Sequence, residues 1–153
     1  MREAIGETSE LVYDLSPPIL YELGLIAAIK WKLEQVEKKF GFITVFQSNE
    51  NLMELNTDIK ILLFRMVCEL LNNAIKHSGA DLIKVEVQKN PKNITIMVID
   101  DGNGFDFSQG MNLSDLGGFG LFSINERLDS LQGSLVIESE PSKGTEIIAT
   151  VPI

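Results

Sequence analysis

The sequence has little cysteine, little histidine and no long apolar run. Cys68 is the one cysteine among 153 residues, so no disulfide can form within the chain, which suits a reducing compartment. The single histidine, His77, excludes a metal site built from several histidines. No apolar run approaches the ~20 residues that span a bilayer, and the first ten residues lack the apolar stretch of a signal peptide. We therefore expect a cytoplasmic domain without direct membrane contact, although a longer parent protein could carry a membrane anchor.

Basic residues are also scarce. Lys and Arg number 13 against 22 Asp and Glu, which gives a formal net charge of −9. A nucleic-acid-binding surface needs an excess of basic side chains, so we expect no nucleic-acid partner. A phosphate-bearing ligand would be repelled unless Mg²⁺, backbone N–H donors and a few local cations offset the field.

The pattern of apolar residues predicts one domain in which helices and strands alternate irregularly. The length suits a single hydrophobic core, and the pair Pro17-Pro18 separates the residues before it from the rest of the chain. One expected helix ends near residue 15, and three more cover about 20–40, 57–76 and 121–131. The expected strands cover 42–46, 82–87, 94–99, 135–138 and 146–151. A polar, glycine-rich stretch at 102–120 reads as a functional or disordered loop. This order predicts an α+β fold, a two-layer sandwich.

The helix expected at 57–76 carries a polar stripe along the edge of its apolar face. Glu69, Asn73 and His77 are spaced four residues apart, and Lys76 lies beside them. The side-chain carbonyl of Asn73 suits Mg²⁺, while Glu69 could hold a metal-bound water or act as a base toward it. Lys76 could reach a phosphate as a point charge. On spacing alone, a solvated helix edge is the better interpretation.

An acidic, glycine-containing motif follows the strand expected at 94–99. Asp100 could accept a hydrogen bond from an exocyclic amine such as that of adenine. Gly102 and Gly104 have no Cβ and would let the backbone approach a flat base. An ordinary acidic turn after a strand is the alternative, because Asp-Gly pairs are common there.

Two further glycine motifs lie later in the chain. Gly117-Gly118-Phe119-Gly120-Leu121 leads into the helix expected at 121–131, and exposed amides at a helix start bind phosphate. No Gly-Lys-Ser/Thr follows it, so it is not a Walker loop, and a flexible hinge is the alternative. In Lys143-Gly144-Thr145 the threonine hydroxyl could lie near the base, or the three residues form a hairpin turn.

The order of these motifs resembles that of the GHKL ATPase superfamily, named for gyrase, a heat-shock chaperone, histidine kinases and MutL. Glu-x-x-x-Asn, Asp-x-Gly-x-Gly, Gly-x-Gly-Leu and Gly-Thr occur in sequence between Glu69 and Thr145. Segments 15–20 and 23–25 are similar to the joint between dimerisation helix and catalytic domain in histidine kinases that partner NarL-type response regulators. Segment 72–78 resembles their N box, and segment 125–128 resembles the helix after their lid.

The resemblance implies a Bergerat ATP-binding fold, with a mixed, mostly antiparallel sheet and helices on one face. It implies that Asn73 binds Mg²⁺ with Glu69 supporting it through water, that Asp100 reads the adenine amino group, and that residues 105–117 form a lid. The implied ATP-binding positions are Asn73, Lys76, His77, Asp100, Gly102, Gly104, Phe105, Gly118, Gly120, Leu121 and Thr145. One position departs from the pattern: Phe119 stands where the family commonly has a histidine, and it cannot donate a hydrogen bond to phosphate.

The function implied is that of a protein-histidine kinase catalytic domain at 17–153, preceded by a remnant of the dimerisation helix at 1–16. The domain would bind Mg-ATP and supply the γ-phosphoryl group to a histidine on a dimerisation domain that this chain lacks. Its partners would be that domain, a second copy of the full-length protein and a response regulator. His77 lies in the N box and is not expected to accept phosphate. An ATP-hydrolysing assembly module, a serine-directed anti-sigma-type kinase and an inactive nucleotide-binding relic are the alternatives.

Overall fold

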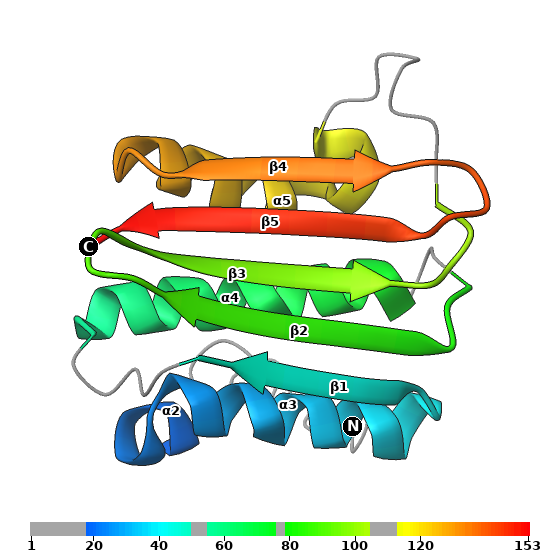
Figure 1. Ribbon diagram of the computed structural model, residues 1–153, viewed down its shortest axis with the longest axis horizontal. Coiled ribbons are helices and arrows are strands. Elements are labelled where there is room, and N and C mark those ends of the chain that lie inside the picture. The colour runs from blue at the N-terminus through cyan, green and yellow to red at the C-terminus, as the bar shows by residue number, and fades with distance from the viewer. Residues whose placement is uncertain (1–17, 50–54, 76–78, 105–112) are drawn as a thin grey trace, which may run out of the picture.

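The computed structural model describes residues 18–49, 55–75, 79–104 and 113–153, with the backbone alone at 113–121. The expected helix end before residue 15 and the dimerisation remnant at 1–16 lie outside these residues. The elements, shown in Figure 1, are the helices α2 (Pro18–Leu23), α3 (Leu25–Phe40), α4 (Thr57–Asn73) and α5 (Leu113–Ser130) and the strands β1 (Ile43–Ser48), β2 (Leu82–Lys89), β3 (Asn93–Asp100), β4 (Ser134–Ser139) and β5 (Thr145–Pro152). None of these helices is long and apolar enough to cross a bilayer.

The strands form one five-stranded sheet in the order β1-β2-β3-β5-β4. β1 runs parallel to β2, and the other neighbouring pairs are antiparallel. Figure 1 shows the sheet as one layer with α3, α4 and α5 behind it. The predicted two-layer α+β sandwich with a mixed, mostly antiparallel sheet and helices on one face is therefore confirmed.

The core lies between the sheet and its helices. Alternate residues of β3 are buried, because successive side chains of a strand point to opposite faces and one face meets the helices. α4 contributes the broadest buried face, including Leu63, Phe64 and Leu71, each 0% exposed. Cys68 is buried in the same helix with a free thiol, as expected for a small apolar side chain.

The single helix expected at 20–40 is wrong, because the structure has two helices separated by Gly24. The backbone of Gly24 has φ 94° and ψ −178°, a conformation that favours glycine and interrupts helical hydrogen bonding. The break lets Leu20 and Leu25 both reach the core, where they are 2% and 1% exposed. Gly41 ends α3 in the left-handed conformation, and its N–H donates to the carbonyl of Glu37.

The start of α4 matches the prediction, and its end differs slightly. Asn56 caps the helix, since its side-chain oxygen accepts the N–H of Asp58 at 2.8 Å. The regular helix ends at Asn73 rather than Lys76. The N–H of Ala74 donates to the carbonyls of Leu70 and Leu71. Ala74 and Ile75 then follow as a π-type turn.

The largest correction concerns α5. A loop was expected at 102–120 and a helix at 121–131, but the helix runs from Leu113 to Ser130. The glycine run was interpreted as a boundary, whereas glycine in a helix interior costs only about 1 kcal/mol relative to alanine. Ser114 and Asp115 are residue types that favour a first helical turn, and this signal was missed.

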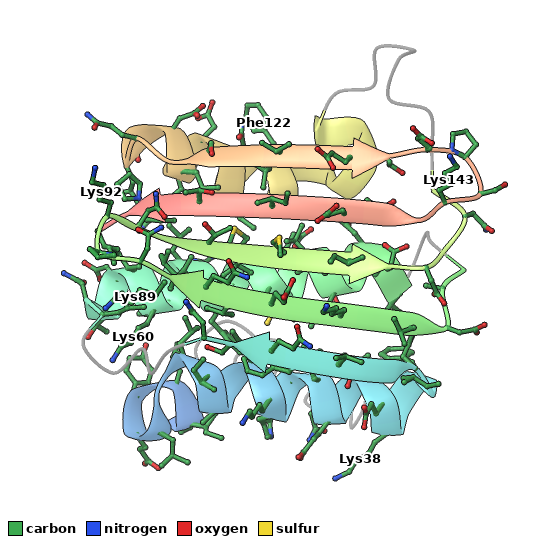
Figure 2. All side chains as sticks on the ribbon, in the orientation of Figure 1. Lys38, Lys60, Lys89, Lys92, Phe122 and Lys143 are labelled. Atoms are coloured by element: carbon green, nitrogen blue, oxygen red, sulfur yellow. The ribbon has the colours of Figure 1, made fainter. Side chains whose placement is uncertain are left out.

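We predict that replacing Phe64 with alanine lowers the free energy of unfolding by about 3–5 kcal/mol, because a fully buried ring leaves a cavity. Urea unfolding measures this. Phe122→Ala is the matched control, since Phe122 is 45% exposed on the outside of α5 (Figure 2) and should change stability by no more than ~0.5 kcal/mol. Equal losses at the two positions would contradict this account of the core.

Candidate functional site

The predicted site residues come from elements that end on the same side of the domain. In Figure 1 the C-terminal end of α4, the arrowhead of β3 and the turn between β4 and β5 all lie on the right. Asp100 is the last residue of β3 and pairs directly with Thr145, the first residue of β5. Ser139, the last residue of β4, pairs with Thr145 from the other side. These three residues form one row on the helix-facing side of the sheet, because they continue its buried positions.

Asp100 is a buried carboxylate, 8% exposed, held by backbone donors. Its Oδ1 accepts the N–H of Gly102 at 2.9 Å. Burial raises the pKa of Asp100 above its ordinary value and the nearby Asp101 carboxylate adds to this, whereas the N–H groups of Gly102 and Thr145 oppose it. Asp100 makes no ion pair with any residue that the structure describes. The site thus holds an acceptor whose charge is only partly compensated by the protein.

A hydroxyl pair lies beside this carboxylate. Ser139 Oγ donates to the carbonyl oxygen of Gly144 at 3.0 Å. Ser139 Oγ and Thr145 Oγ1 are 2.9 Å apart and share a second hydrogen bond. The position of Thr145 near Asp100 agrees with the sequence-based expectation, whereas no sequence motif indicated Ser139.

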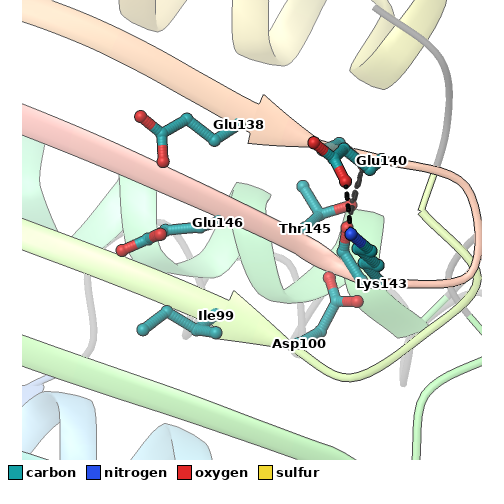
Figure 3. A pocket seen from close by; sticks show the side chains of 9 residues that line it. Ile99, Asp100, Glu138, Glu140, Lys143, Thr145 and Glu146 are labelled. Carbon is teal, nitrogen blue, oxygen red and sulfur yellow. Dashed lines mark hydrogen bonds and ion pairs between the residues drawn. The ribbon is translucent and has the colours of Figure 1, made fainter.

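A cavity of about 270 Å³ opens between the ends of β3, β5 and β4 (Figure 3). Its lining includes Asp100, Ser139 and Thr145 and the β4–β5 turn, and also Ile99, Glu138 and Glu146, which point to the face of the sheet away from the helices. The cavity therefore opens toward that outer face, and α4 contributes no residue to it, whereas the side chains of Asp100, Ser139 and Thr145 continue the helix-facing positions of their strands. This volume is close to the lower end of the range for small-molecule clefts. Lys143 lies at the rim, where its Nζ pairs with Glu140 at 3.0 Å. Of the lysines labelled in Figure 2, Lys143 is at this end of the sheet, while Lys89 and Lys92 are at the opposite end.

Two glycines allow the loop after β3 to pack directly against the β4–β5 turn. Gly104 has φ 65°, and a Cβ there would collide with the carbonyl oxygen of Glu140 and lie 2.8 Å from that of Gly144. Gly144 has φ 79°, and a Cβ there would collide with the carbonyl oxygen of Asp100. The structure therefore gives Gly104 a packing role, while its contact with a base remains a prediction. Gly102 is buried behind the carboxylate that it holds.

Asp101 ties the same loop to the start of β2. Its Oδ1 accepts the N–H groups of Asp81 at 2.9 Å and Leu82 at 3.0 Å, and these bonds lower the pKa of Asp101. On the other side of the loop, the N–H of Ser142 donates to the carbonyl of Asn103 at 2.6 Å. The residues that carry Asp100 are thus held between two neighbouring segments. The sequence did not single out Asp101, because this residue occupies the first x position of the Asp-x-Gly-x-Gly motif.

The polar stripe on α4 lies at the edge of the core. Glu69 and Asn73 are both half-buried, and α4 packs against β3 and α5. The structure therefore disfavours a fully solvated helix edge for these two residues. Lys76, His77 and Phe105 lie outside the described residues.

Gly118, Gly120 and Leu121 lie inside α5 rather than at its start, which corrects the expected helix N-terminus at this motif. The free N–H groups of a helix belong to its first turn, here the turn that begins at Leu113. A phosphate contact through the amides of Gly118 and Gly120 therefore requires a helix that begins later than Leu113. Their role in phosphate binding remains a prediction.

The sandwich and its buried carboxylate are features of an ATP-binding domain, and comparison with known families agrees. Residues 58–153 match the family described as histidine kinase-, DNA gyrase B- and HSP90-like ATPases, HATPase_c. The chain belongs to this family. The resemblance found in its motifs is thereby confirmed.

Two curated relatives are similar over the whole chain. The signal transduction histidine-protein kinase/phosphatase DegS of Brevibacillus brevis is 32% identical over 153 residues, which are 100% of this chain and 39% of that protein. The oxygen sensor histidine kinase NreB of Staphylococcus carnosus is 33% identical over 156 residues, which cover 100% of this chain and 43% of that protein. The chain therefore spans about two fifths of the length of these relatives.

Solved histidine kinases share the fold. The catalytic domain of the histidine kinase ThkA superposes with a TM-score of 0.63 at 20% identity, covering 84% of this chain and 89% of that one. The histidine kinase domain of a blue-light-activated kinase from Erythrobacter litoralis superposes with a TM-score of 0.65 at 17% identity, covering 84% and 60%. At these identities the likeness supports the fold alone.

We predict that Gly104→Ala destabilises the domain by about 2–5 kcal/mol, because it combines left-handed strain with a collision against the β4–β5 turn. Gly41→Ala is the matched control. Gly41 has φ 78° but nothing lies within 4 Å of its missing Cβ, so it should lose only the strain of about 1–2 kcal/mol. Thermal or urea unfolding compares the two variants. Losses of the same size would show that the close packing of the loop is unimportant.

Proposed function

We propose that this domain binds Mg-ATP and supplies its γ-phosphoryl group to a histidine on a separate dimerisation domain. The observation that carries the proposal is the Asp100 carboxylate, which is buried at the end of β3 on the helix-facing side of the sheet and held by backbone N–H groups. Family membership supports the nucleotide, and both curated relatives are named histidine kinases.

Asp100 is suited to recognise the amino group of adenine. An ionised carboxylate accepts hydrogen bonds and donates none, so it matches an N–H donor and opposes an acceptor. Its burial weakens competition from water, and a charge-assisted hydrogen bond is roughly twice as strong as a neutral one. The ligand's amino group would complete the set of donors that Gly102 and Thr145 begin.

The triphosphate needs positive charge that this acidic chain supplies sparingly. With a formal net charge of −9, direct electrostatic attraction of ATP is weak or absent. We assign Mg²⁺ to the side-chain oxygen of Asn73, supported by Glu69, because hard cations prefer oxygen ligands and both side chains lie half-buried on α4. Lys76, His77, Gly118 and Gly120 would contact the phosphates. When bound, the metal supplies charge neutralisation, and the chain contributes mainly positioning.

The phosphoacceptor histidine would lie on another domain. The chain's one histidine, His77, follows α4, and residues 1–16 contain none. The full-length protein would act as a homodimer and pass the phosphoryl group to a response regulator.

The test mixes this domain and labelled Mg-ATP with a histidine-bearing dimerisation domain of a DegS-type kinase and a NarL-type regulator. The regulator should become phosphorylated. Hydrolysis without transfer in that mixture would favour an ATP-hydrolysing module instead.

We predict that Asp100→Asn weakens Mg-ATP binding at least tenfold in calorimetry, because the amide can present a donor to the adenine amine and the charge is lost.

The same variant should be as stable as the native chain at pH 7, or more stable. Burial raises the pKa of Asp100, so the stability associated with its proton is present at low pH and lost as pH rises through the folded-state pKa. The neutral amide avoids that loss, and its advantage should shrink as the pH is lowered.

Asp129→Asn is the matched control for charge, since Asp129 is exposed near the end of α5. It should leave both nucleotide affinity and stability nearly unchanged. If Asp100→Asn bound Mg-ATP as tightly as the native chain does, Asp100 would be removed from the base site.

We predict that Asn73→Asp leaves base recognition intact but lowers phosphotransfer to the added dimerisation domain by roughly tenfold or more, because the new charge alters the placement of metal and phosphates. The rate is measured across a Mg²⁺ titration. Asn72→Asp is the matched control, since Asn72 is also half-buried but lies about a quarter turn away on α4. A normal Mg²⁺ dependence in Asn73→Asp would show that the metal ligand is another residue.

A further inference from the structure

The hydroxyl groups of Ser139 and Thr145 form a short hydrogen-bonded chain beside Asp100, on the helix-facing side of the sheet. Ser139 Oγ lies 3.0 Å from the carbonyl oxygen of Gly144 and 2.9 Å from Thr145 Oγ1. Asp100 is the cross-strand partner of Thr145 (Figure 3). The direction of these bonds decides what the proposed base site offers to a ligand.

That direction follows from counting protons. A serine or threonine hydroxyl has one proton to donate, and a carbonyl oxygen can only accept. The bond to Gly144 therefore uses the proton of Ser139. Ser139 Oγ must then accept in its bond with Thr145, so the proton of Thr145 points to Ser139. Thr145 Oγ1 has only lone pairs left for a ligand.

Thr145 and Asp100 consequently present hydrogen-bond acceptors side by side, because they are direct partners on adjacent strands. A purine with an amino group at position 6 offers two N–H donors there. A purine with a keto group at that position offers an oxygen, which neither acceptor can satisfy. An unsatisfied polar group in a largely buried site costs free energy of binding.

Asp100 alone would discriminate less strictly. A carboxylate can also accept the N1–H of a keto purine, and a freely rotating threonine hydroxyl could then donate to the keto oxygen. Such a pair would satisfy a keto purine well. Ser139 prevents this arrangement because it already receives the proton of Thr145.

We propose that Ser139 is a specificity-determining residue, which holds the Thr145 hydroxyl as an acceptor and so makes the base site select a 6-amino purine over a 6-keto purine. Ser139 acts through Thr145 and is a positioning residue. The inference rests on the proposed ATP-binding function and deepens it, since it assigns base selectivity to a residue outside the recognised motifs.

The test measures affinities for Mg-ATP and Mg-inosine triphosphate, which differ at position 6, by calorimetry. In Ser139→Ala the Thr145 hydroxyl is released and can donate. The preference for ATP over inosine triphosphate should then fall about tenfold, the value of one hydrogen bond of ordinary net strength. Most of this change should come from tighter binding of inosine triphosphate. Ser139→Thr keeps a hydroxyl on a strand position and should restore the preference.

Ser134→Ala, at the exposed start of the same strand, is the matched control and should leave the preference unchanged. Thr145→Val provides a second route if Ser139→Ala folds poorly. It removes the hydroxyl, so the preference should fall through weaker ATP binding without any gain for inosine triphosphate.

The outcomes separate this inference from the proposed function. If the native chain fails to bind Mg-ATP, the proposed function fails. If the native chain binds Mg-ATP and Ser139→Ala leaves the preference unchanged, or weakens both nucleotides equally, the role of Ser139 is refuted. An unchanged preference in Thr145→Val would refute it as well.

Discussion

The burial of one carboxylate, Asp100, is the constraint on which the rest of this site depends. A carboxylate that is 8% exposed must be surrounded by donors, and here they are backbone N–H groups from the loop after β3 and from the start of β5. That arrangement requires the two strands to end at the same level, which their antiparallel register provides. The backbone donors offset only part of the cost of desolvating the Asp100 carboxylate, so its pKa stays raised. A hydrogen-bond donor on a ligand can therefore stabilise the ionised carboxylate further.

Close backbone packing maintains this arrangement. The loop after β3 meets the β4–β5 turn without intervening side chains, which only glycine permits at residues 104 and 144. Asp101 fixes the other side of the loop by accepting two N–H groups at the start of β2. Adjacent carboxylates thus have opposite roles. Asp101 is exposed and its pKa is lowered by the backbone that it holds, whereas Asp100 is buried and available to a ligand.

The proposed phosphate-binding part of the site depends on other interactions than the proposed base-binding part. The chain is acidic, and the cation at the cavity rim, Lys143, is already paired with Glu140. In this structure the glycine-rich segment, which was expected to expose its amides, lies inside α5. Glycines make that half of α5 intrinsically the weaker part of the helix, because each costs about 1 kcal/mol relative to alanine. The residues proposed to recognise the base therefore lie within the described part of the sheet, whereas the proposed phosphate contacts involve α4, α5 and the segments that flank them.

The sequence by itself determined the α4 helix, the strands, the sandwich class, the family, and the positions of Asp100 and Thr145, because periodicity and motif order depend on local spacing along the chain. Only the tertiary structure decided the break at Gly24, the early start of α5, the clamp made by Asp101 and the pairing of Ser139 with Thr145. Helix ends follow from small differences in helix propensity, which packing overrides. The burial of Leu20 and Leu25 in the core therefore decided the break at Gly24. Hydrogen bonds between residues distant in sequence depend on strand register, which no short motif encodes.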